Sequence, residues 1–144
     1  MLVVFLLQDA LQVLFSAILP APNLVMGMAM TLQLRRRGSG MLWLGFLLGL
    51  LWDLRWSSVV GLSSLAWGSS IFLFLLLLEA IPAAREERLL AFLLGSSSLG
   101  AELLLRSALW WTLGGGLPGL GVLLVQLSLG ILAFAGMVQL LREI

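Results

Sequence analysis

Apolar stretches long enough to cross a lipid bilayer fill almost the whole chain and are separated only by short turns. Hydrophobic residues make up 61% of the 144 residues and charged residues only 10%, against roughly 45–50% and about 25% in soluble proteins. A soluble domain of this size has too much surface for its volume to hide so much apolar area. The sequence therefore predicts an integral membrane protein, with residues 1–144 forming a single transmembrane domain.

Breaks in hydropathy divide the chain into six predicted all-α membrane segments. The predicted segments are residues 1–19, 22–37, 41–54, 58–78, 89–111 and 120–141. The second is short, because only residues 24–34 are continuously apolar and about 20 residues are needed to span the hydrocarbon. Pro20 and Pro22 separate the first two segments, since proline lacks a backbone donor.

The arginines predict the orientation of the six segments. With both termini in the cytoplasm, one arginine lies outside, Arg106 lies within a segment, and the inner arginines are Arg35, Arg36, Arg37, Arg85, Arg88 and Arg142. The single outer one is Arg55, so the bias follows the positive-inside rule. A second segment that only dips into the bilayer would keep the arginines inside and move the N-terminus outside.

Missing residue types exclude most catalytic and metal chemistry. The chain has no Cys, His or Tyr, and all eight of its basic residues are Arg. Thiolate and imidazole ligands, a Schiff-base lysine and a base for a serine nucleophile are therefore all absent. The net charge of +1 indicates no nucleic-acid partner. We expect no enzyme, cofactor or metal site.

Gly45 and Gly49 form a small-xxx-small pair in the third segment. Such pairs let helix backbones approach closely. The pair fits packing within this chain or against the helix of a partner, and we favour the former.

Asp53 ends the same segment and has two interpretations. An ionisable group inside a membrane is costly unless it is paired, which suggests a functional carboxylate. The simpler explanation is an interfacial residue that ends the helix and turns the chain together with Arg55.

Glu102 and Arg106 lie four residues apart in the fifth segment, on one helix face. This spacing and order favour an ion pair, which we expect to face the bundle interior. At 1.5 Å per residue, Asp53 and Glu102 reach a similar depth. We predict that Arg106 bonds Glu102, Asp53 or both in a structural polar network.

A polar patch of Gln8, Asp9 and Gln12 lies in the middle of the first segment. Gln8 and Gln12 share one helix face, and Asp9 lies about 100° away. Hydrogen bonding to a neighbouring helix or to a partner protein is the expected role.

The third and fourth segments carry a motif that resembles the MreD family. Gly45, Gly49 and Asp53 match its G-x-x-x-G-L-x-x-D run, and Gly61 matches a glycine eight residues after the aspartate. Pro22-Asn23-Leu24 resembles a Pro-Asp-Leu that opens the second segment of the family. The chain departs from the family where relatives often have a Ser-Gly turn, because it has Arg55, Trp56, Ser57 and Ser58 there.

This resemblance implies a non-enzymatic scaffold of the bacterial cell-elongation machinery in the inner membrane. It implies binding to the membrane helix of MreC, and indirect links to the peptidoglycan polymerase and transpeptidase and to MreB. The six-helix arrangement also resembles the substrate-binding subunits of energy-coupling-factor transporters, so a vitamin-binding subunit is the alternative. An intramembrane enzyme is the third possibility, and it needs a convergent set of titrating groups that this sequence barely provides.

Overall fold

The computed structural model describes residues 1–15, 23–35, 40–56, 59–114, 116 and 119–143. Within these residues every regular element is helical, as predicted. The elements are α1 (Leu2–Phe15), α2 (Leu24–Arg35), α3 (Gly40–Trp56), α4 (Leu62–Ala80), a 3₁₀ turn (Pro82–Arg85), α5 (Arg88–Thr112) and α6 (Leu120–Glu143). The predicted boundaries at Pro20, Pro22, Arg36, Arg37, Ser57 and Ser58 lie outside the described residues.

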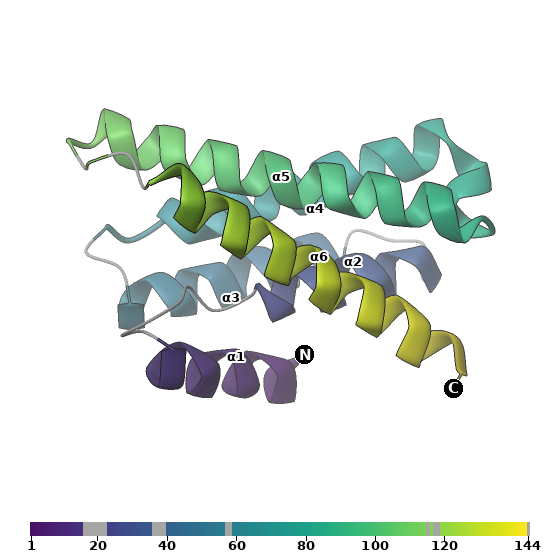
Figure 1. Ribbon diagram of the computed structural model, residues 1–144, viewed down its shortest axis with the longest axis horizontal. Helices are drawn as coiled ribbons and strands as arrows, with labels where there is room; N and C mark the ends of the chain where they lie inside the picture. Colours follow the sequence, from purple (N-terminus) through teal and green to yellow (C-terminus); the bar gives the residue numbers. More distant parts are fainter. Residues whose placement is uncertain (16–22, 36–39, 57–58, 115, 117–118, 144) are drawn as a thin grey trace.

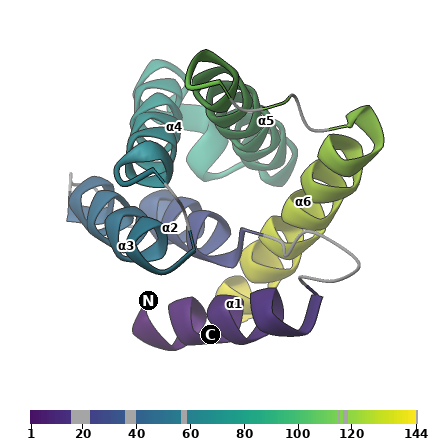
Figure 2. The same ribbon diagram turned by 90° about the vertical axis from the view of Figure 1, so that its left-hand side faces the viewer.

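The six helices form a bundle with α2 at its centre and α1 at its edge (Figures 1 and 2). α4 lies between α3 and α5, while α2 contacts all five other helices. Val25, Met26, Ala29 and Met30 of α2 are fully buried. The helix that looked too short to span is therefore the one that the others surround.

Three helices are long and apolar enough to cross a membrane. They cover Leu62–Ala80, Arg88–Thr112 and Leu120–Leu140. The other helices are shorter: α1 has 14 residues, α2 has 12 and α3 has 17, which is about 21, 18 and 26 Å at 1.5 Å per residue against a core of about 30 Å. By length and composition, three of the six predicted membrane crossings are therefore supported among the described helices.

Aromatic side chains join the long helices at the core. Phe134 of α6 is fully buried and meets Phe74 of α4 edge to face, with ring centroids 6.3 Å apart. Its ring occupies the space where a Cβ at Gly95 of α5 would stand. A glycine on one helix thus makes room for the largest side chain that its neighbour buries.

Candidate functional site: polar side chains at the helix ends

The carboxylate of Asp53 caps the N-terminus of α4. Its Oδ2 accepts hydrogen bonds from the backbone N–H groups of Gly61, at 3.0 Å, and of Ser63, at 2.8 Å; Oδ1 also lies 3.0 Å from the Ser63 nitrogen. The Ser64 N–H donates to Oδ2 at 3.3 Å. Asp53 is fully buried, so this cap lies in the protein interior.

The start of α4 needs such an external cap. The first four N–H groups of a helix have no partner within it, and in a membrane protein such groups must be satisfied internally. Gly61 stands at the N-cap with φ 100° and ψ −14°, a left-handed conformation that suits glycine. Because Gly61 has no side chain to cap the helix, Asp53 of the preceding helix supplies the acceptor.

Gly49 and Gly45 lie one and two turns before Asp53, respectively, and face α4. A Cβ at Gly49 would stand 2.6 Å from the Ser64 Cα, and one at Gly45 would collide with the Ile71 Cδ1. The two glycines therefore serve packing within the chain, as favoured from the sequence. Together with Asp53 and Gly61 they form what we call the α3–α4 clasp.

A second cap of the same kind lies at the start of α2. The Val25 N–H donates to the Gln8 Oε1 at 2.8 Å, and the Met26 N–H donates to the Asn23 Oδ1 at 3.2 Å. Asn23 is thus the N-cap residue of α2, a position that Asn and Asp favour about equally. This equivalence explains why Asn can stand where the family usually has Asp.

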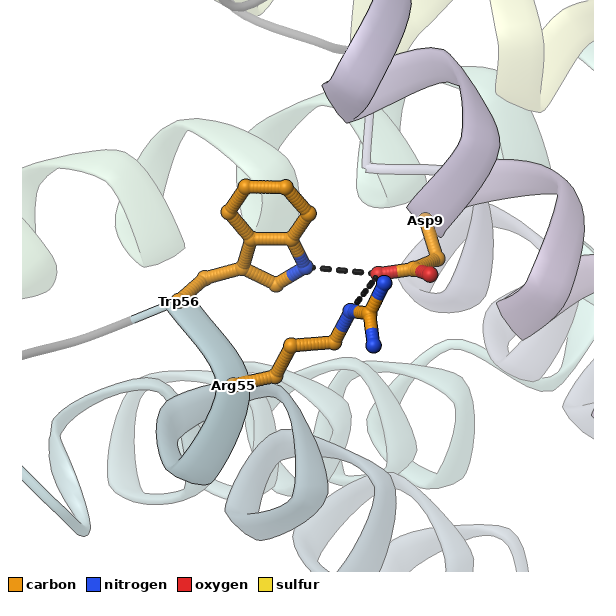
Figure 3. A network of polar contacts seen from close by, with 3 residues as sticks. All are labelled: Asp9, Arg55 and Trp56. Atoms are coloured by element: carbon orange, nitrogen blue, oxygen red, sulfur yellow. Dashed lines mark hydrogen bonds and ion pairs between the residues drawn. The ribbon is translucent and has the colours of Figure 1, made fainter.

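Asp9 joins α1 to the end of α3 (Figure 3). Its Oδ1 lies 2.7 Å from the Arg55 Nε and accepts a hydrogen bond from the Trp56 Nε1 at 2.6 Å. The Arg55 guanidinium also lies over the Trp56 ring, 5.5 Å from its centroid. This contact could not be predicted from the sequence, because nothing in the spacing of residues 9 and 55 indicates that they meet.

Glu102 and Arg106 share a face of α5, but no hydrogen bond or ion pair joins Arg106 to Glu102 or to Asp53 among the described residues. Glu102 is buried, and its Oε1 has no hydrogen-bond partner in the described part of the chain. Arg106 attracts the Glu102 carboxylate electrostatically, and the buried Trp67 Nε1 of α4 has no hydrogen-bond partner among the described residues. The predicted bond from Arg106 to Glu102, Asp53 or both is thus not seen among the described residues, where only the electrostatic attraction to Glu102 is present.

The residues predicted to contact a partner protein differ in how far the chain itself covers them. Gln8, Gly45 and Gly49, which the sequence offered for a partner helix, are covered within the chain. Asp9 is held by Arg55 and Trp56. Gln12 is half-buried, and no hydrogen bond joins it to another described residue.

These side chains hold helices in place and do not converge on a reaction centre. Within the described ranges, no three potential metal ligands of the types His, Cys, Asp and Glu lie together. The arrangement can fix the ends of α2 and α4 and tether α1, which are structural tasks.

Comparison with known proteins identifies the family. A sequence model described as rod shape-determining protein MreD matches residues 1–112, which contain α1 to α5 and end where α5 ends. No curated protein and no solved structure matches the chain, so the predicted likeness to transporter subunits is not confirmed. Because the match covers well over half of its length, the chain belongs to the MreD family of rod shape-determining membrane proteins.

Proposed function

We propose that this chain is a non-enzymatic membrane scaffold that binds the membrane helix of MreC. The family match carries this proposal, since MreD proteins have a role in rod shape determination and belong to the MreB and MreC shape machinery. The family is known for structural rather than enzymatic work. Through MreC, the chain would help to control the polymerase and transpeptidase of wall synthesis.

The use of polar groups supports a scaffold. The carboxylates of Asp9 and Asp53 both bind groups on a neighbouring helix or helix end, and the Gln8 amide does the same. A protein whose buried polar side chains fix helix positions is suited to present a defined surface in the bilayer, since irregular backbone there must be satisfied internally.

The outer face of α1 is the surface that best fits a partner helix. Its exposed apolar residues are Leu2, Val3, Leu6, Leu7, Val13 and Leu14. Gln12 adds an amide that makes no hydrogen bond to another described residue. Amide side chains hydrogen-bond across membrane helices, so a polar group on the MreC helix would satisfy Gln12. α1 also lies at the bundle edge (Figure 2), where a further helix can approach.

Crosslinking from α1 tests this placement. A photoreactive residue at Gln12 is compared with one at Leu132 of α6, a matched control that is 68% exposed. We expect MreC to crosslink from position 12 and not from position 132 when the two proteins are made together. Equal crosslinking from both positions contradicts the α1 surface. A purified chain that carries a vitamin and no MreC would instead favour the transporter alternative.

We further propose six crossings of the bacterial inner membrane, with both termini cytoplasmic. The arginine bias supports this orientation. Short α1 and α2 can be accommodated by local thinning of the bilayer and by snorkelling of flanking residues. The chain lacks cysteine, so single cysteines at positions 2 and 86 can be labelled from either side. Labelling of position 2 from outside and of position 86 only from inside contradicts six full crossings.

A further inference from the structure

One face of α5 leads from the core of the bundle to the end of the helix. Glu102, Arg106 and Trp110 follow one another at four-residue spacing, which places them on one helix face. Glu102 is 1% exposed, Arg106 is half-buried and Trp110 is 36% exposed. Arg106 therefore stands where this face of α5 passes from the buried core to the exposed helix end.

Arg106 attracts the Glu102 carboxylate electrostatically but forms no close ion pair among the described residues. A cation in a membrane segment is costly unless it is paired or reaches the interface. Glu102 makes no ion pair with it in the described structure. No charged residue follows Arg106 until Arg142, which is itself a cation. The turn after α5 and the whole adjoining half of α6 therefore supply no counter-charge.

The depth of Arg106 suits the headgroup region of a leaflet. α5 has 25 residues, or about 37 Å, which exceeds a hydrocarbon core of about 30 Å by about 7 Å. Arg106 lies six residues before the helix end at Thr112, so its Cα lies about 9 Å from that end. With α5 centred, the Cα lies only about 5 Å inside the hydrocarbon, within reach of a snorkelling arginine.

Two indoles mark the same end of α5 as interfacial. Trp110 and Trp111 are 36% and 61% exposed, and tryptophan concentrates at the boundary between hydrocarbon and headgroups. An arginine at this position of α5 can reach the level of the lipid phosphates by snorkelling. Its planar fork of donors matches a phosphate in a bidentate manner.

We propose that Arg106 binds the phosphodiester of an anionic lipid, in the leaflet that surrounds the α5–α6 turn. A lipid with net negative charge neutralises the unpaired guanidinium. A zwitterionic lipid carries its own ammonium group next to the phosphate and competes less well. The site consists of Arg106 with the Trp110 indole one turn above it.

Lipid binding by the purified full-length chain tests the proposal. Phosphatidylglycerol, phosphatidylethanolamine and inorganic phosphate are added in turn to the protein in detergent. Bound lipid is measured by native mass spectrometry and stabilisation by the thermal midpoint. We expect phosphatidylglycerol to bind and stabilise more than phosphatidylethanolamine. We expect Arg106→Gln to weaken this binding by about tenfold or more, the scale of one lost charge-assisted contact.

Three further variants keep the test decisive. Arg88→Gln removes the arginine at the opposite end of α5 and should retain the phosphatidylglycerol effect. Glu102→Gln should leave phosphatidylglycerol binding unchanged. Arg106→Lys keeps the positive charge but loses the planar guanidinium, so it should give an intermediate affinity. This variant keeps the test possible even if Arg106→Gln fails to fold. Unchanged phosphatidylglycerol binding in a folded Arg106→Gln protein, or in Arg106→Lys, would overturn the proposal. Equal loss in Arg88→Gln, equal binding of both lipids, or competition by inorganic phosphate would also overturn it.

Discussion

The two antiparallel pairs α3–α4 and α5–α6 differ in how closely they pack near their charged residues. In the α3–α4 clasp, Gly49 brings the backbones into contact and Asp53 is completely enclosed. α6 leans away from α5 at its N-terminal end (Figure 2), and only 11% of its span is buried, against 56% for α4. Gly121, near that end, has open space around it.

This difference shows how close packing decides the partner of a charged group. Within the clasp the N-terminus of α4 is held against Asp53, so the carboxylate finds its donors inside the chain. Beside the open end of α6, Arg106 forms no close ion pair among the described residues, and we propose a lipid as its counter-charge. The first pair therefore stabilises the fold, while the second leaves surface for lipids or proteins.

The largest loss should come from removing the α4 cap. Asp53→Ala leaves the N–H groups of Gly61, Ser63 and Ser64 without their acceptor, and each buried unsatisfied group costs about 1–3 kcal/mol. We expect a loss on the order of 3 kcal/mol in the free energy of unfolding, measured by denaturant titration in detergent micelles. Asp53→Asn keeps one acceptor oxygen and should lose less. If the Asp53→Ala protein is as stable as the parent, the α3–α4 clasp does not stabilise the fold.

The next effect tests the close approach of α3 and α4. Gly49→Ala forces a Cβ against the Ser64 backbone, and such overpacking costs about 1–3 kcal/mol. Gly45→Ala should cost less, because it meets only the movable tip of Ile71. Gly121→Ala on α6 is the matched control and should not destabilise the protein. Thermal midpoints in the order Gly121→Ala, Gly45→Ala, Gly49→Ala, from highest to lowest, would support the comparison, and a reversed order would refute it.

A similar loss is expected where α6 does touch α5. Gly95→Ala collides with the Phe134 ring, again at a cost of about 1–3 kcal/mol. Phe134→Leu shortens the side chain and should relieve the collision, so the double variant should lose less than the sum of the single losses. Strict additivity in a double-mutant cycle of unfolding free energies would mean that the two sites do not touch.

The smallest effect is expected at the tether of α1. The Arg55 side chain is 58% exposed, and exposed ion pairs contribute only about 0–1 kcal/mol. Asp9→Asn also keeps an oxygen for the Trp56 N–H, so we expect a loss below about 1 kcal/mol. Arg55→Gln should give the same loss, and the double variant should add nothing to it. A loss as large as that of Asp53→Ala would show that α1 is as firmly held as α4.

Several residues of the candidate site could be found from the sequence, but their roles could not. The spacing of Gly45, Gly49, Asp53 and Gly61 was visible as a motif. That the aspartate caps α4 depends on a left-handed Gly61 and on how α3 packs on α4. The Glu102–Arg106 pair was predicted from helical spacing alone. The two side chains attract each other electrostatically without a hydrogen bond or close ion pair among the described residues, because a shared helix face allows contact between two side chains and does not require it.

The sequence by itself determined the membrane class, the all-helical fold, the approximate ends of the helices and the family. These follow from local hydropathy, proline and glycine positions and a short motif, all of which are properties of neighbouring residues. Only the tertiary structure decided that short α2 lies at the centre, that Gln8 and Asp53 cap the helices that follow them, and that Asp9 meets Arg55. The physical reason is that a buried polar group bonds to whatever the packing brings near it, and nearly uniform apolar helices carry little information about which faces will meet.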